Sequence, residues 1–184
     1  GRAGADQIGG GEGNDRIGGG NGHDRLAGND GHDSLSGGYG RDTLAGGSGQ
    51  DRLAGQGGSD VLSGGSGRDS LAGGAGADRF VFALAAETRP GAGTRDVITD
   101  FQENVAGERI DLSAIDASSV TGGNNAFTFI GTAAFTQANE NGGLRHVHQN
   151  GNTVIQGSTD HDAAPEFEIE LTGLHTLAAS DFIL

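Results

Sequence analysis

The amino-acid sequence predicts an all-β protein in two parts: a coiled stack of short parallel strands over residues 1–81, and an antiparallel β region over residues 82–184 that caps it. Three observations lead to this fold class. A nine-residue period runs through residues 1–81 without one insertion. Within each period, turn-forming glycines accompany a single apolar residue. From residue 82 the period is lost, and runs of alternating apolar and polar residues follow, with one strong hairpin signal.

The first part contains nine aligned repeats in which most positions are restricted. Positions one and four are always Gly, position six is always Asp, and position eight is Ile, Leu or Phe. Position two is Gly except at Arg2, Asn29 and Gln56. A flexible glycine linker is the alternative, but a linker has no reason to keep Asp at the same position of every repeat. The repeats therefore indicate an ordered structure.

Each repeat is interpreted as a six-residue turn followed by a three-residue strand whose central apolar residue points inward. Two repeats then complete one coil of 18 residues, and alternate repeats stack at the sheet spacing of about 4.8 Å. The position-six aspartates consequently form one ladder on each edge of the stack. The odd repeats contribute Asp6, Asp24, Asp42, Asp60 and Asp78, and the even repeats contribute Asp15, Asp33, Asp51 and Asp69.

The charge of the chain favours a cation as its partner. Acidic residues outnumber basic ones 25 to 11, and the formal net charge is −14, which argues against nucleic acid and anionic membranes. The chain has no Lys, which excludes a Walker phosphate loop, and no Cys, which excludes disulfides and thiolate metal sites. No apolar run is long enough to span a membrane. We expect a part of a longer protein, because the chain begins inside a repeat and contains no Met.

The energetics of the repeats also require a cation. One apolar residue per repeat gives a thin core, glycine is costly to order, and stacked carboxylates repel one another. Turn carbonyls and Asp carboxylates offer only oxygen ligands, which Ca²⁺ prefers, whereas Mg²⁺ requires tighter octahedral geometry and Zn²⁺ prefers nitrogen or sulfur. The sequence therefore predicts calcium sites in which each carboxylate bridges neighbouring ions.

The nine repeats match the pattern GGxGxDxUx, in which U is a large apolar residue, so residues 1–81 resemble the calcium-binding nonapeptide repeats of RTX proteins. The resemblance implies a right-handed parallel β-roll with Ca²⁺ between neighbouring turns on each edge. Its ligands would be the Asp ladders and the carbonyl groups at positions two and four. At position four these are Gly4, Gly13, Gly22, Gly31, Gly40, Gly49, Gly58, Gly67 and Gly76. At position two they are Gly11, Gly20, Asn29, Gly38, Gly47, Gln56, Gly65 and Gly74.

Two further ligands are predicted beyond the last repeat. Counting on by nine from Asp78 leads to Glu87 and Asp96, and the segment 96–98 repeats the order of positions six to eight. We expect Glu87 to lie below Asp69 and Asp96 below Asp78, so that the roll ends near residue 98. Together with the complete Asp pairs, this predicts about seven to nine bound ions. The alternative is a chance match of phase in a loop.

The C-terminal region is predicted to cover the open apolar end of the stack. Strands are expected at FVF (80–82), DVITDF (96–101), RIDL (109–112), AFTFI (126–130) and EFEIEL (166–171). In EFEIEL the apolar residues alternate with Glu, which is typical of a half-buried strand. Asn150-Gly151 separates RHVHQ from TVIQ and is a strong hairpin signal.

Four stretches of this region, DVITDFQENVAGERIDLSAIDA, FTFIGTAAF, GNTVIQG and ELTGLHTLAASDFIL, resemble the C-terminal domain of serralysin-type secreted metalloproteases. That domain is similar to the one of type I secreted lipases. The resemblance implies an extracellular protein exported by a type I ATP-binding-cassette (ABC) exporter, whose uncleaved signal ends at residues 181–184. Where family members carry a glycine- and aspartate-rich loop, this chain has Asp160, Asp162 and Glu166 without turn-forming glycines, so we do not expect a calcium site there.

No catalytic site is predicted, because the chain lacks the HExxH zinc signature and the GxSxG nucleophile elbow. His146 and His148 share one strand face, for which a polar surface is favoured over metal binding. We expect a monomeric, non-catalytic module that folds on calcium outside the cell and serves secretion and stabilisation of an exported enzyme. That enzyme would be a zinc metalloprotease, a lipase or a polysaccharide-modifying enzyme.

An alternative function is binding of an acidic polysaccharide. Arg16, Arg52 and Arg68 occupy outward positions of the even repeats and could hold carboxylates in bidentate contacts. Such a strip resembles the repeat modules of mannuronan epimerases, which are also RTX rolls and contact alginate. The simpler interpretation, which the sequence favours, is that these arginines only offset the charge of the neighbouring Asp ladder.

Overall fold

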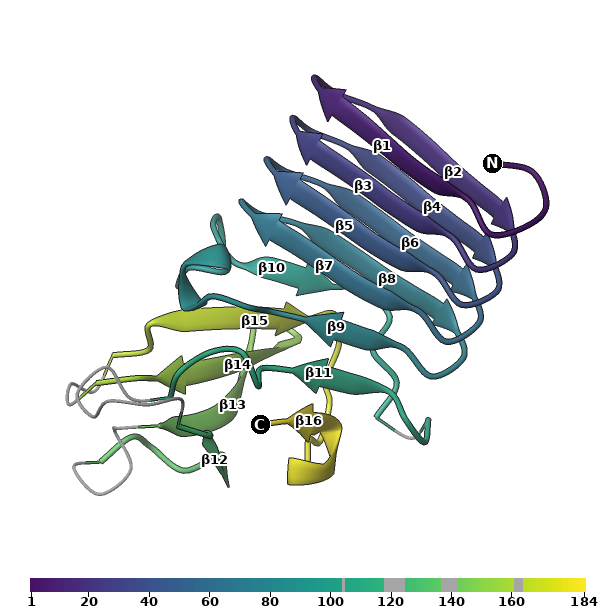
Figure 1. Cartoon of the computed structure of the whole chain (residues 1–184). Coiled ribbons are helices and arrows are strands. Elements are labelled where there is room, and N and C mark those ends of the chain that lie inside the picture. The colour runs from purple at the N-terminus through teal and green to yellow at the C-terminus, as the bar shows by residue number, and fades with distance from the viewer. Residues whose placement is uncertain (104, 118–124, 137–141, 161–163) are drawn as a thin grey trace.

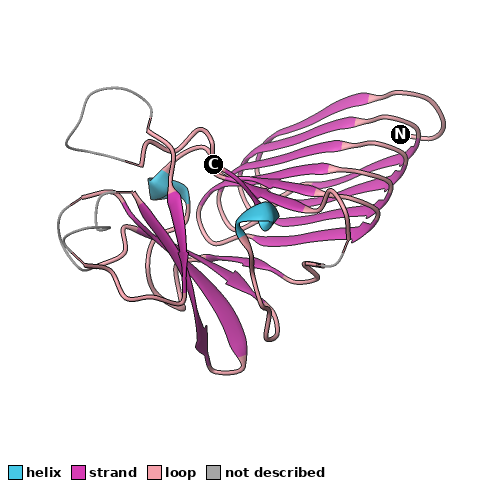
Figure 2. Ribbon diagram, turned by 90° about the horizontal axis from the view of Figure 1, so that it is seen from below, coloured by secondary structure: helices cyan, strands magenta, loops and turns pink. Residues whose placement is uncertain are grey.

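The computed structural model describes residues 1–103, 105–117, 125–136, 142–160 and 164–184. It is an all-β structure in which a parallel β-roll leads into an antiparallel region, as the sequence predicts (Figures 1 and 2). The helical segments among the described residues are two single 3₁₀ turns, η1 (Ala85–Glu87) and η2 (Ala179–Asp181). No described helix has the length and apolar character needed to cross a membrane.

The roll consists of two parallel sheets, one built from the odd repeats and the other from the even repeats (Figure 1). Each strand pairs with the strand one coil later, so that Ile8 lies opposite Leu26 and Ile17 lies opposite Leu35. This register confirms the predicted coil of 18 residues. The odd strands are β1 (Gln7–Glu12), β3 (Arg25–Asp30), β5 (Thr43–Ser48), β7 (Val61–Ser66) and β9 (Arg79–Val81). The even strands are β2 (Arg16–Asn21), β4 (Ser34–Tyr39), β6 (Arg52–Gly57) and β8 (Ser70–Ala75).

The strands of the roll are longer than predicted. Strands β1 to β8 each span six residues, from position seven of one repeat to position three of the next. The ladder of pairs skips position one, since Gly9 pairs with Ala27 and the next pair is Gly11 with Asn29. The chain bends at position one. Because the next coil bends at the same position and lies at the same spacing, the two strands pair again beyond the bend. The turn is therefore reduced to positions four to six, and the predicted three-residue strand is wrong.

Both sheets continue past residue 81 into the C-terminal region. Strand β10 (Asp96–Ile98) pairs with β8, and β11 (Arg109–Asp111) pairs with β9, both in parallel. The odd sheet ends with β16 (Phe182–Ile183), which pairs with β11. The even sheet extends from β10 through β15 (Phe167–Leu171), β14 (Asn152–Ser158), β13 (Gly143–Gln149) and β12 (Thr128–Gly131). The C-terminal region thus prolongs the roll as well as closing it.

Strands β13 and β14 form the predicted antiparallel hairpin. Asn150 and Gly151 connect them with φ angles of 52° and 83°. Two successive positive φ values are typical of the tight turn that Asn-Gly favours. Strand β15 pairs antiparallel with β14 and parallel with β10, so it joins the hairpin to the roll.

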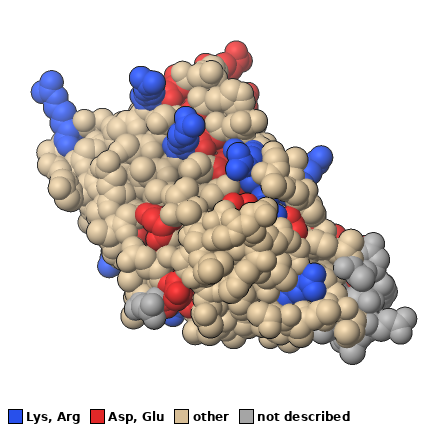
Figure 3. Space-filling view, turned by 180° about the vertical axis from the view of Figure 1, so that it is seen from behind, with Lys and Arg blue, Asp and Glu red and all other residues tan. Residues whose placement is uncertain are grey.

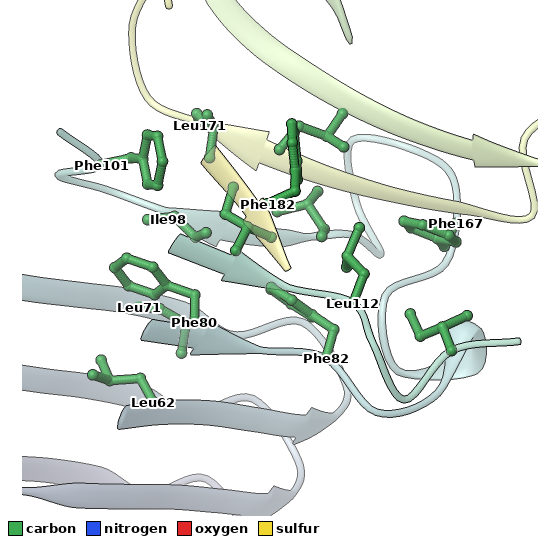
Figure 4. Close-up of a cluster of buried hydrophobic side chains, with 14 of the residues drawn as sticks. Leu62, Leu71, Phe80, Phe82, Ile98, Phe101, Leu112, Phe167, Leu171 and Phe182 are labelled. Carbon is green, nitrogen blue, oxygen red and sulfur yellow. The ribbon is translucent and has the colours of Figure 1, made fainter. Parts of the chain in front are cut away.

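One continuous hydrophobic core runs through the roll and the cap. In the roll it is the column of position-eight residues from Ile17 to Leu71, and Phe80 continues this column. The ring of Phe80 lies 6.3 Å from that of Phe101. Around them, Figure 4 shows the side chains of the closing strands and turns, among them Phe82, Ile98, Leu112, Phe167, Leu171 and Phe182. Large aromatic side chains therefore close the apolar end that a column of leucines would leave open.

A buried ion-pair cluster holds the segment before β10 against the outer face of β15. The guanidinium of Arg95 lies 2.9 Å from a carboxylate oxygen of Glu168 and 2.7 Å from one of Glu170. Glu168 also accepts hydrogen bonds from the backbone of Gly91 and the amide of Gln156. Burial raises the pKa of Glu168, but these donors and Arg95 together lower it below its usual range. The half-buried strand predicted here is therefore wrong at Glu168, because the preceding segment covers this face.

Replacement of Arg95 by Met is expected to destabilise the protein by about 3–5 kcal/mol, because Glu168 would remain buried without its cation. Denaturant unfolding at a fixed calcium concentration measures this difference. Arg89→Met is the matched control, since Arg89 is exposed, and it is expected to unfold like the wild type. An Arg95 variant with the stability of the control would show that the cluster contributes little.

Candidate metal centre

Each edge of the roll carries a column of stacked aspartates, as the repeats predict. Along each column, Oδ1 of one Asp accepts the backbone N–H of the Asp one level earlier: Asp42 from Asp24, and Asp51 from Asp33, both at 2.8 Å. Glycine at position one makes room for these side chains, because a Cβ on Gly46 would overlap Oδ2 of Asp51. The aspartates from Asp24 to Asp78 are at most 3% exposed. The columns are therefore interior features of the edges.

The second carboxylate oxygen is buried and has no hydrogen-bond partner within the described part of the chain. This holds for Oδ2 of Asp15, Asp24, Asp33, Asp42, Asp51, Asp60, Asp69, Asp78 and Asp96. A buried anionic oxygen without a donor is unfavourable, and native structures rarely keep one. Here the same oxygen is left without a donor at level after level, which indicates a ligand position that the fold repeats.

Backbone carbonyl groups of position one lie next to these carboxylates, since a Cβ on Gly46 would meet both Oδ2 of Asp51 and the carbonyl oxygen of Gly64, and carbonyls of positions four and two stack along the same turns. The carbonyl oxygen of Gly22, at position four, projects toward Gly40 one level later, where a Cβ would overlap it. Position two has the same arrangement, and positive φ is required there. Asn29 and Gln56 meet this requirement with φ values of 80° and 76°, and both keep the ladder register. These two substitutions therefore leave the turn geometry intact.

The donor set consists of oxygens and fits Ca²⁺. The columns offer carboxylate oxygens, whereas zinc prefers nitrogen or sulfur ligands. Neighbouring levels stack carboxylates and backbone carbonyls along the same edge. Ca²⁺ takes six to eight oxygen ligands in loose geometry, and the columns can offer them.

The stacked carboxylates in the C-terminal half of the columns have raised pKa values, namely those of Asp42, Asp51, Asp60, Asp69, Asp78 and Asp96. The pKa rises to about 6 for Asp60 and Asp69 and to about 8 for Asp96. Burial is the largest cause in each case; the N–H donated from the previous level partly offsets it, and the charge of neighbouring carboxylates adds to it. A cation between the levels would allow these groups to be ionised together.

The closing level of the even column differs from the prediction. Oδ1 of Asp96 accepts the backbone N–H of Asp69 at 2.7 Å, so the expectation that Asp96 lies below Asp78 is wrong. Successive aspartates of a column are 18 residues apart within the repeats, but Asp69 and Asp96 are 27 residues apart. The prediction fails because the connection between β9 and β10 is longer than the turn that joins two repeats. The expectation that Glu87 lies below Asp69 is also wrong, because Asp96 takes that position and Glu87 accepts the backbone N–H of Ala83 instead. Glu87 lies close enough for its charge, after burial, to contribute to the raised pKa of Asp69 and Asp96.

Glu108 closes the odd column and was not predicted. Its Oε2 accepts the backbone N–H of Asp78 at 3.0 Å, and burial raises its pKa to about 7. Asp100, in the same closing segment, accepts the backbone N–H groups of Gly73 and Gly74 in β8, both at 2.9 Å. A signal for Glu108 exists, because ERI at 108–110 repeats the order of DRF at 78–80. The separation is not a multiple of nine, so the period does not find it.

The two histidines of β13 have different surroundings. His146 is 5% exposed and its ring stacks on Phe129 with centroids 5.9 Å apart, so the expected polar surface is wrong for this residue. Burial lowers the pKa of His146. His148 is exposed and donates from Nε2 to the carbonyl of His175 at 3.0 Å.

Of the acidic residues considered before β15, Asp162 lies outside the described residues. Glu166 accepts a hydrogen bond from the backbone of Thr159.

The arginines of the even repeats lie along one edge, beside the aspartate column. All of Arg16, Arg52 and Arg68 are exposed. Two adjoining grooves run between positions five and seven of the even repeats. Arg16 and Arg52 line the first groove, and Arg52 and Arg68 line the second. Both grooves are also lined by His32 and Gln50. Figure 3 shows basic and acidic side chains interspersed on the face seen from behind the view of Figure 1. The edge therefore combines exposed cations with buried anions.

Known proteins resemble this chain over most of its length. The family model described as peptidase M10 serralysin C terminal matches residues 5–184. The AlgE6R3 subunit of the Azotobacter vinelandii mannuronan C5-epimerase is 34% identical, with a TM-score of 0.58, over 83% of this chain and 77% of that one. The AlgE6R2 subunit of the same enzyme is 28% identical, with a TM-score of 0.50, over 88% of both chains. The extracellular lipase LipA from Serratia marcescens aligns with 98% of this chain and 38% of its own, at 16% identity and a TM-score of 0.38. No curated protein matches.

Proposed function

The chain belongs to the peptidase M10 serralysin C-terminal family, and from this premise we propose that it is a calcium-binding β-roll module that folds when calcium binds outside the cell. The observation that carries the proposal is the buried, unpartnered Oδ2 atom that recurs along both aspartate columns. Backbone carbonyls of the same turns would complete an all-oxygen ligand set, which is the set that Ca²⁺ prefers.

Each calcium site would lie between two neighbouring levels of a column. The odd column, from Asp6 to Glu108, encloses five such intervals, and the even column, from Asp15 to Asp96, encloses four. The proposed stoichiometry is therefore nine ions per chain, at the upper end of the range expected from the repeats. Glu108 would supply the last carboxylate of the odd column, a position for which Asp96 was expected. Glu87 would add a carboxylate to the last interval of the even column.

Calcium would then control when the roll folds. Where free calcium is scarce, the buried carboxylates repel one another and the chain stays unfolded, which is the state an exporter can pass. Outside the cell, calcium reaches the range of about 10⁻⁴–10⁻³ M in which extracellular modules bind it. Because the sites do not exist in the unfolded chain, the free energy of binding becomes free energy of folding.

Replacement of Glu108 by Gln and of Asp96 by Asn is expected to remove one bound ion each, because each carboxylate borders a single interval. Asp51→Asn should remove two, because Asp51 lies between two intervals. Bound calcium per chain is measured by equilibrium dialysis and atomic absorption. Asp30→Asn, at an exposed position outside the columns, is the control and leaves the count unchanged. Unaltered stoichiometry in the Glu108 and Asp96 variants would rule out the closing sites.

The module would also serve secretion and stabilisation of an exported enzyme. Its last residues, 181–184, resemble the end of the C-terminal signal that type I ABC exporters recognise, and the family match supports this role. The folded, capped roll would stabilise whatever catalytic part accompanies it. A zinc metalloprotease, a lipase or a polysaccharide-modifying enzyme is proposed for that part, and an extracellular location follows from the same reasoning.

A second candidate function is binding of an acidic polysaccharide. The observation in its favour is that Arg16, Arg52 and Arg68 line adjoining grooves on one edge. The likeness to a subunit of a mannuronan C5-epimerase adds support. Calorimetry with mannuronan oligomers at saturating calcium tests this function.

A further inference from the structure

The edge formed by the turns of the even repeats, called the even edge below, has adjoining grooves that are bordered by hydrogen-bond donors. Nδ1 of His32 accepts the backbone N–H of Gln50 at 2.7 Å, so the proton of the neutral ring is on Nε2, where it can be donated to a ligand. Oδ1 of Asn14 likewise accepts the N–H of His32 at 2.8 Å, which leaves the amide NH₂ of Asn14 to face outward. Arg52 and Arg68 add guanidinium groups to the same border. Such a row of donors suits an anion with several carboxylates.

Calcium would reverse the sign of the charge beneath this row. The acidic groups of the even edge are Glu12, Asp15, Asp30, Asp33, Asp51, Asp69, Glu87 and Asp96. The arginines of the same edge are Arg16, Arg52, Arg68 and Arg89. Counted with every acid ionised, the eight acids exceed the four arginines and the edge has a formal charge of −4; the raised pKa of the buried Asp96 makes this charge smaller but leaves its sign negative. One Ca²⁺ in each of the four even intervals adds eight positive charges, so the edge becomes positive by four.

We infer that the even edge binds a linear, carboxylated polysaccharide only while calcium occupies the column beneath it, so that calcium regulates binding through charge as well as through folding. The inference rests on the proposed calcium function. The levels are about 4.8 Å apart and the Debye length at physiological salt is about 8 Å, so a ligand in the groove lies within range of the column. A straight row of donors across successive levels suits an extended chain, and guanidinium groups match carboxylates in bidentate contacts.

The first experiment measures binding of a fluorescent mannuronan oligomer to the whole chain at saturating calcium, by anisotropy. Arg52→Gln/Arg68→Gln is expected to weaken binding at least about tenfold, the loss of a charge-assisted contact. Arg25→Gln/Arg41→Gln removes the same charge from exposed positions of the odd edge and should bind like the wild type. Circular dichroism and the calcium count are recorded on the same samples, so loss of the fold or of calcium is detected separately.

The second experiment separates charge from folding. Asp51→Asn removes two proposed ions and one carboxylate from the even edge, a change of three charges toward negative. Asp42→Asn makes the same change on the odd edge. With equal β content by circular dichroism, Asp51→Asn is expected to weaken oligomer binding by a clearly larger factor. Equal factors for the two variants would mean that calcium acts through folding alone, and the inference would be overturned.

Two further outcomes distinguish the inference from the proposed function. A wild-type chain that binds about nine calcium ions but no oligomer would overturn the inference and leave the calcium function standing. A chain that binds no calcium would remove both. Binding of a single-stranded DNA with the affinity of the mannuronan oligomer would overturn the assignment to a carboxylated polysaccharide.

Discussion

Chelation of calcium is expected to unfold the parallel β-roll. Without the ion, the levels from Asp15 to Asp78 and the level of Asp96 would each hold a buried carboxylate oxygen that has no donor among the described residues, and burial opposes the ionisation of Asp96, whose pKa rises to about 8. The apolar core of the roll is a single column of one side chain per repeat, so it cannot offset the repulsion. We therefore expect the β signal in circular dichroism to be lost in excess chelator and to return when calcium is added back.

Limited proteolysis under the same conditions provides a second measurement. Sites within the repeats should be cleaved in chelator and protected in calcium. Mg²⁺ at the same concentration is the control, and it should not restore the signal, because it requires tighter octahedral geometry than the turns provide. A β signal that survives complete removal of calcium would contradict the proposed function.

Replacement of Gly58 by Ala is expected to have the largest effect of any single methyl addition in the roll. Gly58 has a φ of 142°, which L-residues rarely adopt, and its Cβ would overlap the carbonyl oxygen of Gly40. Backbone strain of about 1–2 kcal/mol and overpacking of about 1–3 kcal/mol together predict a loss of about 2–5 kcal/mol. The displaced carbonyl is also a proposed calcium ligand, so calcium affinity should fall as well.

Gly18→Ala is the matched control for this variant. A Cβ on Gly18 would meet no atom within 4 Å, and Ala27 and Ala45 occupy the same position of other repeats. The variant should be neutral or stabilised by up to about 1 kcal/mol, because alanine reduces the entropy of the unfolded chain. Denaturant unfolding and calcium titration of both variants provide the comparison. Similar stability of the two would mean that the glycine at position four is not required by the turn.

The repeats could be predicted in detail because identical segments impose identical local geometry. The 18-residue coil, the inward column and the two aspartate columns follow from the period alone. The length of the strands does not, because pairing beyond the bend at Gly10 depends on the level above and not on the residues themselves. The hairpin at Asn150-Gly151 was predictable for a different reason, since its signal is local.

The last carboxylate of each aspartate column could not be predicted in this way, because the segments that lead to it do not follow the nine-residue repeat. Asp69 is followed in its column by Asp96, and Asp78 by Glu108, at separations of 27 and 30 residues. Only the folded chain shows which acid meets which column. The contact of Arg95 with Glu168 spans 73 residues, and no local pattern in the strand EFEIEL reveals that its outer face is covered.

The last strand, β16, lies within the folded odd sheet, and this restricts when its residues can be bound by another protein. Phe182 is 6% exposed and pairs with Ile110 of β11, and Asp181 accepts a hydrogen bond from the backbone of Ala178. Under the proposed secretion role, a receptor that binds these residues in extended form would have to do so before the odd sheet is complete. Recognition by the proposed exporter and folding of β16 would then exclude each other, so the proposed export would proceed in one direction only.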